Sequence, residues 1–216
     1  ARRLLERQPV AQWREKVLKS KEHRVLIQGG LALMTVAPSR DNSLELLQSV
    51  SQAMARFVSD RDFISYLRLT QVALIRGEIL PHDVPGLRDQ LAEEFPASDS
   101  EINRELIRLL CFLQASNGIN TYLDYLKSDA PEIDRLHMAL HLRFLKEGWT
   151  TQSRMALLEF YEEAQKRKGG GAYPRYILNV TRDVAINLDP ATARNVLLRG
   201  DQLPNHNCPW SKWARQ

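Results

Sequence analysis

An apolar pattern of helical period constrains this chain most strongly, because it recurs through nearly the whole sequence with only short interruptions. Apolar side chains follow one another at intervals of three and four residues, which places them on one face of an α-helix. In the segment 100–114, Ile102, Leu106, Leu109 and Leu113 share such a face. The chain has only 10 Gly and 10 Pro, too few for the many tight turns of an all-β protein. The sequence therefore predicts an all-α fold.

About ten short helices joined by brief loops are expected. Their ranges are 10–19, 22–36, 43–58, 61–76, 84–95, 100–114, 119–127, 132–147, 151–167, 173–188 and 190–199. Antiparallel pairs of such helices recur at about 30–45 residues, the range of two-helix repeats. We therefore predict a HEAT-like α-solenoid over residues 1–200, with an irregular helical bundle as the alternative. Residues 201–216 are predicted to form an extended linker toward a following domain.

Several local features of these helices can be predicted. Gly29 and Gly30 are expected to break the second helix, and Ser43 to cap the third. On the segment 132–147, Ile133 and Phe144 are expected to face the core. A further expectation concerns the two cysteines. Cys111 lies in an apolar run and is expected to be buried, whereas Cys208 lies in the polar tail, and a disulfide between them is left open.

The charge of the chain is mildly basic. Lys and Arg number 30 and Asp and Glu 26, which gives a formal net charge of +4. Basic and acidic residues are interleaved, and the densest basic run, 166–168, is short. This pattern favours a solvated surface of mixed sign over a dedicated nucleic-acid face, which would carry a denser basic stripe.

Few residues suggest catalysis or metal binding. His137 and His141 lie one helical turn apart, as in helical zinc sites, but Met138 occupies the position where zinc proteases carry a glutamate. No third ligand lies close in sequence. We therefore keep these two histidines as weak metal candidates, and expect no catalytic residue and no cofactor in this chain.

Tryptophans and glycines supply the remaining candidates, for interaction or structural roles. Trp149 follows a predicted helix end, and the glycine loop 169–171, which includes Gly169 and Gly170, precedes a later helix. We predict that Trp149 and this loop lie close together and that the loop is a flexible or positive-φ turn. Trp210 and Trp213 in the tail are expected to dock on the last helices or on a following domain.

The stretch 84–188 resembles the HEAT-like helical segment of large multidomain proteins of planctomycetes and related bacteria. The residues that carry the resemblance are Asn103-Arg104-Glu105-Leu106, Arg108-Leu109-Leu110, Leu113-Gln114, His137-Met138-Ala139-Leu140, Leu145-Lys146-Glu147-Gly148-Trp149-Thr150, Gly169-Gly170, Tyr176 and Asn179. Such proteins carry a membrane-bound-dehydrogenase-type β-propeller before this segment and a c-type cytochrome domain after it. The resemblance implies a secreted or periplasmic redox protein in which this piece is a scaffold.

These observations predict a non-catalytic helical-repeat scaffold or protein-interaction domain. The chain starts without Met and its end reads like continuing sequence, so we expect it to be a fragment of a larger haem-containing protein. Its partners would be other domains of that protein or another protein. The alternative is a nucleic-acid-binding HEAT-like repeat, which requires basic side chains that converge on one face. No apolar stretch approaches the ~18–20 residues that span a bilayer.

Overall fold

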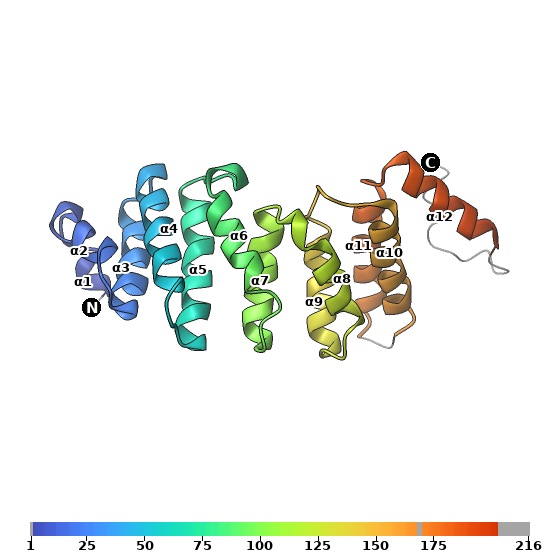
Figure 1. Ribbon diagram of the computed structural model, residues 1–216, viewed down its shortest axis with the longest axis horizontal. Coiled ribbons are helices and arrows are strands. Elements are labelled where there is room, and N and C mark those ends of the chain that lie inside the picture. The colour runs from blue at the N-terminus through green and yellow to red at the C-terminus, as the bar shows by residue number, and fades with distance from the viewer. Residues whose placement is uncertain (1, 168–169, 203–216) are drawn as a thin grey trace. The chain divides into compact units, whose positions relative to one another are not determined.

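The computed structural model describes residues 2–167 and 170–202, and all regular structure in these residues is helical (Figure 1). The predicted all-α fold is confirmed, since the twelve α-helices pack on one another and no strand occurs in the described part. The chain divides into two compact units, residues 1–115 and residues 116–216. Each unit is described by itself below.

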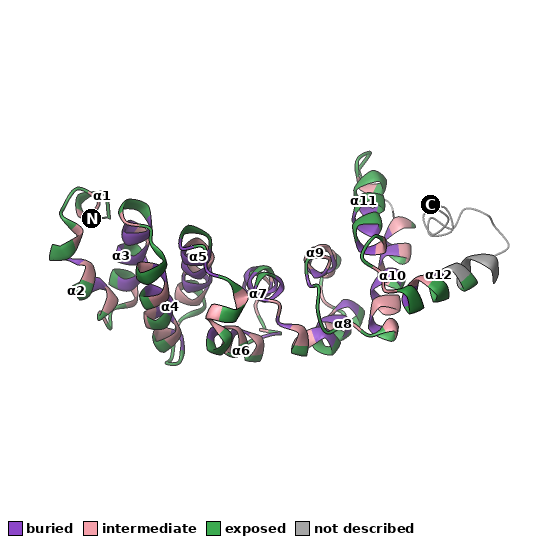
Figure 2. Cartoon of the chain, turned by 90° about the horizontal axis from the view of Figure 1, so that it is seen from above, coloured by how far each residue is buried: buried purple, intermediate pink, exposed green. Residues whose placement is uncertain are grey.

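Unit 1 is built from two layers of helices. Its helices are α1 (Arg2–Leu5), α2 (Arg14–Leu18), α3 (His23–Val36), α4 (Arg40–Met54), α5 (Asp60–Arg76), α6 (Pro85–Glu93) and α7 (Ser100–Phe112), with 3-10 turns at Val10–Gln12 and Pro81–Asp83. In one layer α1, α3, α5 and α7 lie side by side, and in the other α2, α4 and α6 do so (Figure 2). Each helix therefore packs on the next but one along the chain.

Unit 2 is centred on one long helix. It contains a 3-10 turn at Ser116–Gly118 and the helices α8 (Ile119–Lys127), α9 (Glu132–Leu142), α10 (Thr151–Gln165), α11 (Tyr173–Ala185) and α12 (Pro190–Gln202). Helix α10 packs against α8, α9, α11 and α12. Its Tyr161 is fully buried, and the hydroxyl donates a hydrogen bond to the carbonyl oxygen of Ala139 on α9 at 2.5 Å. This contact ties α10 to α9.

Helix α3 continues through Gly29 and Gly30, so the predicted break there is wrong. A Cβ atom at Gly29 would lie 2.5 Å from the side chain of Val17 on α2, and one at Gly30 would lie 2.9 Å from Leu46 on α4. The two glycines therefore let neighbouring helices approach α3 closely. The close packing offsets the cost of glycine inside a helix, which is about 1 kcal/mol per residue relative to alanine.

Helix α4 begins earlier than predicted, and Ser39 caps it instead of Ser43. The Ser39 hydroxyl oxygen accepts the amide N–H of Asn42 at 3.2 Å. Ser43 lies one turn inside the helix, is fully buried, and donates a hydrogen bond to the sulfur of Met34. Both serines fit the residue preference of a helix start, and only tertiary packing separates their roles.

Helix α9 ends at Leu142, which is earlier than predicted, and this changes which side chains face the core. Ile133 is 67% exposed and Phe144 is 52% exposed, so the expectation that both face inward is wrong. Gly148, in the turn between α9 and α10, adopts a positive φ of 78°. Cys111 on α7, by contrast, is 2% exposed, which confirms its predicted burial.

No helix in residues 2–167 and 170–202 is both long enough and apolar enough to cross a membrane.

Candidate functional site

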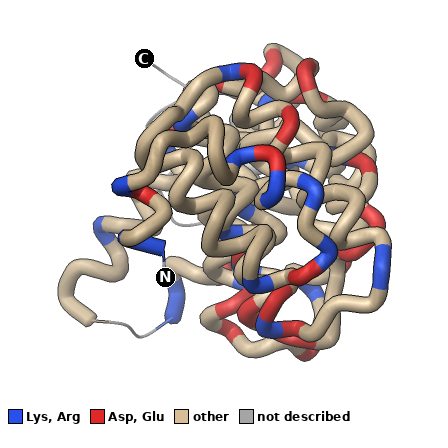
Figure 3. The backbone as a smooth tube through the Cα atoms, turned by 90° about the vertical axis from the view of Figure 1, so that its left-hand side faces the viewer, with Lys and Arg blue, Asp and Glu red and all other residues tan. Residues whose placement is uncertain are grey.

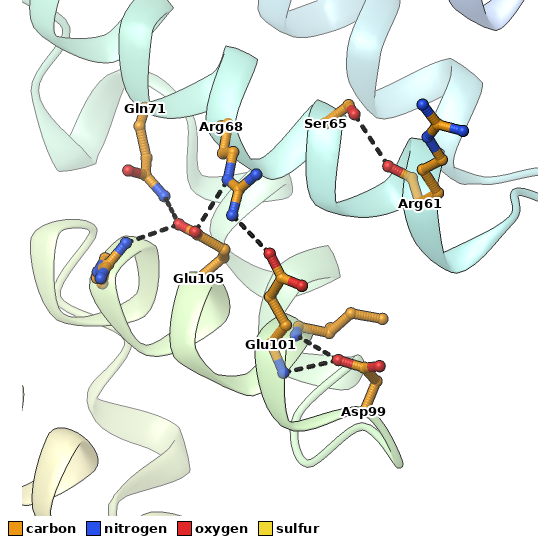
Figure 4. A network of polar contacts seen from close by, with 9 residues as sticks. Arg61, Ser65, Arg68, Gln71, Asp99, Glu101 and Glu105 are labelled. Atoms are coloured by element: carbon orange, nitrogen blue, oxygen red, sulfur yellow. Dashed lines mark hydrogen bonds and ion pairs between the residues drawn. The ribbon is translucent and has the colours of Figure 1, made fainter. Parts of the chain in front are cut away.

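Helices α5 and α7 lie side by side in unit 1 and together carry an extended network of side-chain hydrogen bonds and ion pairs (Figure 4). We call the adjoining side chains of these two helices the α5–α7 surface. It consists of Arg68, Gln71 and Ile75 from α5 and Glu101, Glu105, Arg108 and Phe112 from α7. The members on each helix follow one another at three, four or seven residues, so each set occupies one face.

Glu105 is the centre of this network. Its side chain is only 6% exposed, and both carboxylate oxygens accept hydrogen bonds. Oε1 accepts from Nε of Arg68 at 3.0 Å, and Oε2 accepts from Nε2 of Gln71 at 2.8 Å and from Nη1 of Arg108 at 3.0 Å. A buried carboxylate is stable only when its oxygens are satisfied in this way.

Arg68 links Glu105 to the start of α7. Its Nη2 donates to Glu101 at 2.7 Å, and Glu101 is 55% exposed. Asp99 caps the same helix end, where its Oδ1 accepts the amide N–H groups of Glu101 at 2.6 Å and Ile102 at 3.0 Å. The first turn of α7 and the middle of α5 are thus held together by charge-assisted hydrogen bonds (Figure 4).

The network sets the ionisation of its members. Burial alone would raise the pKa of Glu105, but the hydrogen bonds from Gln71 and Arg68 and the charges of Arg108 and Arg68 outweigh it, so the pKa is lowered. The hydrogen bond to Glu105 is likewise the largest cause of the raised pKa of Arg68. Glu105 is therefore a carboxylate at neutral pH, and the network stabilises the fold without supplying a proton donor.

An apolar hollow adjoins the network at the C-terminal ends of α5 and α7. It measures about 170 Å³, and its lining residues are Gln71, Leu74, Ile75, Arg108, Leu109 and Phe112. Ile75 is 69% exposed and Phe112 is 44% exposed. Arg108 belongs to both features, since it donates to Glu105 and also lines the hollow. The site therefore combines an apolar depression with a guanidinium at its rim.

The two candidate histidines are neighbours on α9, as their spacing predicts. Their ring centroids are 4.3 Å apart, and Nδ1 of His141 donates to the backbone carbonyl oxygen of His137 at 2.8 Å. That hydrogen bond engages one of the two ring nitrogens of His141. Within residues 2–167 and 170–202, no group of three or more His, Cys, Asp or Glu side chains could hold a metal ion.

Trp149 is half-buried and lies just before α10. Its indole Nε1–H donates to the carbonyl oxygen of Leu145 at 2.7 Å, and the guanidinium of Arg154 lies 5.6 Å from the ring centroid. It also lines a hollow of about 450 Å³ together with residues at the C-terminal end of α11, among them Asp183 and Ile186. Trp149 thus anchors the turn between α9 and α10.

The predicted proximity of Trp149 to the glycine loop is wrong. Trp149 precedes α10 and Gly170 follows it, and a helix of this length spans about 22 Å. A Cβ atom at Gly170 or Gly171 would have no neighbour within 4 Å, and neither residue has a positive φ. Gly148, next to Trp149, is the glycine with that conformation among those described. Gly169, Cys208, Trp210 and Trp213 lie outside the described residues.

Sequence reasoning missed the α5–α7 surface, although part of it is visible in the sequence. Glu101, Arg108 and Phe112 follow one another at intervals of seven and four residues on α7, beside the buried stripe that includes Leu106 and Leu109. A second stripe that combines arginine with an aromatic residue is a signal of a binding face. Which helix faces this stripe cannot be read from the sequence, because α5 is about 35 residues earlier.

Comparison with protein-family models, with curated proteins and with solved structures finds no match for this chain. The function is therefore inferred from the residues of the two units.

Proposed function

We propose that this chain is a non-catalytic helical-repeat protein that binds a partner polypeptide on the α5–α7 surface. The observation that carries the proposal is the apolar hollow between Ile75 and Phe112, with the guanidinium of Arg108 at its rim. Exposed apolar side chains around a depression, bordered by arginine, are typical of protein interfaces.

The size of the hollow favours a side chain as its occupant. Small-molecule and cofactor pockets usually measure roughly 300–1,000 Å³. The hollow between α5 and α7, at about 170 Å³, is smaller than that range. A single apolar side chain of a partner polypeptide is a better match, and it would cover Ile75 and Phe112 as it binds.

The charges at the rim indicate which residues would flank that side chain. Arg108 donates to Glu105 through Nη1 and is 43% exposed, so a partner can reach the rest of its guanidinium. Guanidiniums form their strongest hydrogen bonds with carboxylates, often with two N–H groups at once. The expected partner segment therefore has an aliphatic or aromatic residue next to Asp or Glu.

The arrangement of helices within unit 1 supports a scaffold role. Helices pack on the next but one in two layers, and the helices of one layer begin at intervals of about 20 to 45 residues. Stacked helix pairs of this kind present parallel helices as a rigid surface for partners. This order supports a HEAT-like repeat as the finer description of the helical fold.

Selection from a random peptide library tests the proposal. Peptides selected on the full chain should be enriched in an apolar residue flanked by Asp or Glu. Their binding should weaken at least about tenfold in Ile75→Glu and Phe112→Glu, because a carboxylate in the hollow repels the acidic flank. The control is Phe57→Glu, since Phe57 is 93% exposed in unit 1 but does not line this hollow. Equal loss in all three variants would refute the proposed site.

Nucleic-acid binding is the second candidate, and the arginines of α5 favour it. Arg61, Arg68 and Arg76 lie along this helix. However, Glu101 and Glu105 neutralise Arg68, and basic and acidic segments are interleaved along the backbone (Figure 3). The test is to titrate a labelled oligonucleotide into the chain at increasing salt. An affinity that falls steeply as salt rises, and that is weaker in Arg61→Gln and Arg76→Gln, would favour this candidate over a polypeptide partner.

The resemblance of the stretch 84–188 to the HEAT-like segment of multidomain proteins supports a proposal about the natural protein. We propose that this chain is the spacer of a larger secreted or periplasmic redox protein that carries a haem domain. The denatured mass and the visible spectrum of the natural protein test this. A mass well above 24.8 kDa with a haem Soret band is expected, whereas a mass near 24.8 kDa without a chromophore would refute it.

A further inference from the structure

Unit 2 contains a hollow where the end of α9, the start of α10 and the end of α11 meet, and we call it the α9–α11 pocket. It measures about 450 Å³, which falls in the range of small-molecule sites, roughly 300–1,000 Å³. The residues that matter for its chemistry are Arg143, Phe144, Trp149, Arg154, Asp183 and Ile186. None of these has a role in the function proposed for unit 1.

Two arginines with little solvent exposure line the pocket. The side chain of Arg154 is 15% exposed and that of Arg143 is 22% exposed. Each guanidinium lies over an aromatic ring, 4.6 Å from the ring centroid of Phe144 for Arg143 and 5.6 Å from that of Trp149 for Arg154. Such stacking fixes the planes of the guanidiniums and leaves their edges to donate hydrogen bonds.

The nearby carboxylates do not accept hydrogen bonds from all N–H groups of these two arginines. Asp183 accepts one hydrogen bond from Nη1 of Arg143 at 3.2 Å, while the buried Nε of Arg143 has no hydrogen-bond partner among the described residues. Asp189 lies 3.8 Å from Nε of Arg154, beyond hydrogen-bond length, because its oxygens accept the N–H and the hydroxyl of Thr192. Burial is accordingly the main cause of the lowered pKa of Arg154.

Basic side chains outnumber acidic ones in the lining of the pocket. Arg143, Lys146 and Arg154 line it together with Asp183, and Asp189 lies near Arg154. This excess of basic side chains favours a ligand with a negatively charged group.

The walls between these charges are apolar. Phe144 is 52% exposed, Trp149 is half-buried, and Ile186 at the rim is 73% exposed. A bound apolar group would cover these three side chains, and their burial would contribute to affinity. A fully hydrophilic anion, such as a free inorganic ion, would leave them uncovered.

We propose that the α9–α11 pocket binds a monocarboxylate that carries an apolar group. The carboxylate accepts hydrogen bonds from the guanidiniums of Arg143 and Arg154. The apolar group lies against Trp149, Phe144 and Ile186. A small organic acid and the C-terminus of a peptide share this chemistry, and the experiment below separates them.

Octanoate is the probe for the experiment, with 1-octanol as its uncharged counterpart, and both are titrated into the full-length chain. The indole N–H of Trp149, assigned in a ¹H–¹⁵N spectrum by its absence from Trp149→Phe, should shift in a saturable way with octanoate. The same signal should respond much more weakly to 1-octanol. An equal response to both compounds, or no response to octanoate up to its solubility limit, would overturn the proposal.

Arginine variants assign the carboxylate contact. Arg143→Gln and Arg154→Gln should each weaken octanoate binding at least about tenfold, because each removes a charge-assisted hydrogen bond. Arg167→Gln is the matched control, since Arg167 also lies over an aromatic ring, that of Phe160 at 5.5 Å, and also pairs with a carboxylate, yet it is outside the pocket. Undiminished binding in the first two variants, or an equal loss in the control, would overturn the proposed contact.

A rim variant keeps the test valid if an arginine variant fails to fold. Ile186→Glu changes an exposed side chain and should weaken octanoate binding about tenfold by charge repulsion. Ile133→Glu, at a residue of unit 2 that is 67% exposed and outside the pocket, should not. Equal binding by both would overturn the proposal.

An acetylated hexapeptide that ends in leucine separates the two sources of the carboxylate. If it binds more tightly than octanoate, and its C-terminal amide does not bind, the ligand is a peptide terminus. Tighter binding of octanoate assigns a small organic acid. If acid and amide bind equally, recognition of a carboxylate is refuted.

Discussion

Replacement of Glu105 by glutamine should destabilise unit 1 more than any other single change on the α5–α7 surface. The carboxylate accepts hydrogen bonds from Arg68, Gln71 and Arg108, and its side chain is 6% exposed. In Glu105→Gln one oxygen becomes an NH₂ group, which cannot accept from these donors. At least one hydrogen bond is lost, and both guanidiniums lose the charge that they share.

The size of the stability loss depends on how far the carboxylate of Glu105 and the guanidiniums of its partners are buried. A hydrogen bond to a charged group contributes about 1.5–3 kcal/mol, and breaking a fully buried ion pair costs about 3–5 kcal/mol. Arg68 and Arg108 are 55% and 43% exposed, so water can solvate them again after the change. The expected loss is therefore near the lower end, about 2 kcal/mol in the free energy of unfolding of unit 1.

Amide hydrogen exchange on the full chain measures this loss where it occurs. A loss of about 2 kcal/mol corresponds to roughly 30-fold faster exchange of the protected amides of α5 and α7. Amides of α10 in unit 2 should not change. The control is Glu101→Gln, since Glu101 is 55% exposed and should cost less than about 1 kcal/mol. If Glu105→Gln and Glu101→Gln speed exchange equally, the central role of Glu105 is refuted.

The same variant predicts a pH dependence. The pKa of Glu105 is lower in the folded state than in the unfolded chain, where a glutamate titrates near about 4.3. Its contribution to stability is therefore fully present above that value and is lost as pH falls through the folded-state pKa. The difference in exchange between the natural chain and Glu105→Gln should be full at neutral pH and shrink in acid. A difference that grows in acid would contradict the sign of the shift.

Three glycine substitutions and one labelling test probe packing and burial. Gly29→Ala should lower the free energy of unfolding by about 1–3 kcal/mol, because its Cβ would meet Val17 at 2.5 Å. Gly86→Ala, with no atom within 4 Å of its Cβ, should raise the free energy of unfolding by about 0.5 kcal/mol, and urea denaturation measures both variants. Gly148→Ala should cost about 1–3 kcal/mol because its φ is 78°, and faster exchange in α9 and α10 would show it. Burial raises the pKa of Cys111 to about 12, so iodoacetamide should label this thiol at mildly alkaline pH only in denaturant. Because the chain also contains Cys208, the labelled peptide is identified by mass, and labelling at Cys111 in the folded chain would contradict its burial.

Local periodicity was sufficient to predict the helical fold. The residues Ile102, Leu106, Leu109 and Leu113 are all buried, as their spacing predicts, with 5% exposure or less. The helix expected at 119–127 is α8, with the same bounds. These predictions succeed because a helix and its buried face depend on residues within one or two turns of each other.

Predictions that depend on distant neighbours were wrong or absent. Gly29 and Gly30 are a break by local rules, but Val17 and Leu46 from other helices occupy the space that side chains would need. The burial of Glu105 depends likewise on donors from a helix about 35 residues earlier. The sequence contains both sets of residues, but it does not state which helix faces which.

Two exposed isoleucines lie where a binding role and a role in fold stability can be told apart. Ile75 and Ile186 are 69% and 73% exposed, so unit 1 and unit 2 each forgo the ~1.5–3 kcal/mol that full burial of such a side chain contributes. A single exposed isoleucine is ordinary, but each of these lies at the rim of a hollow that an arginine also lines. If the hollows are binding sites, Ile75→Glu and Ile186→Glu should leave the stability of the chain within about 0.5 kcal/mol of its natural value and impair binding alone. If either variant unfolds its unit, the side chain belongs to the core, and the hollow beside it is a packing defect.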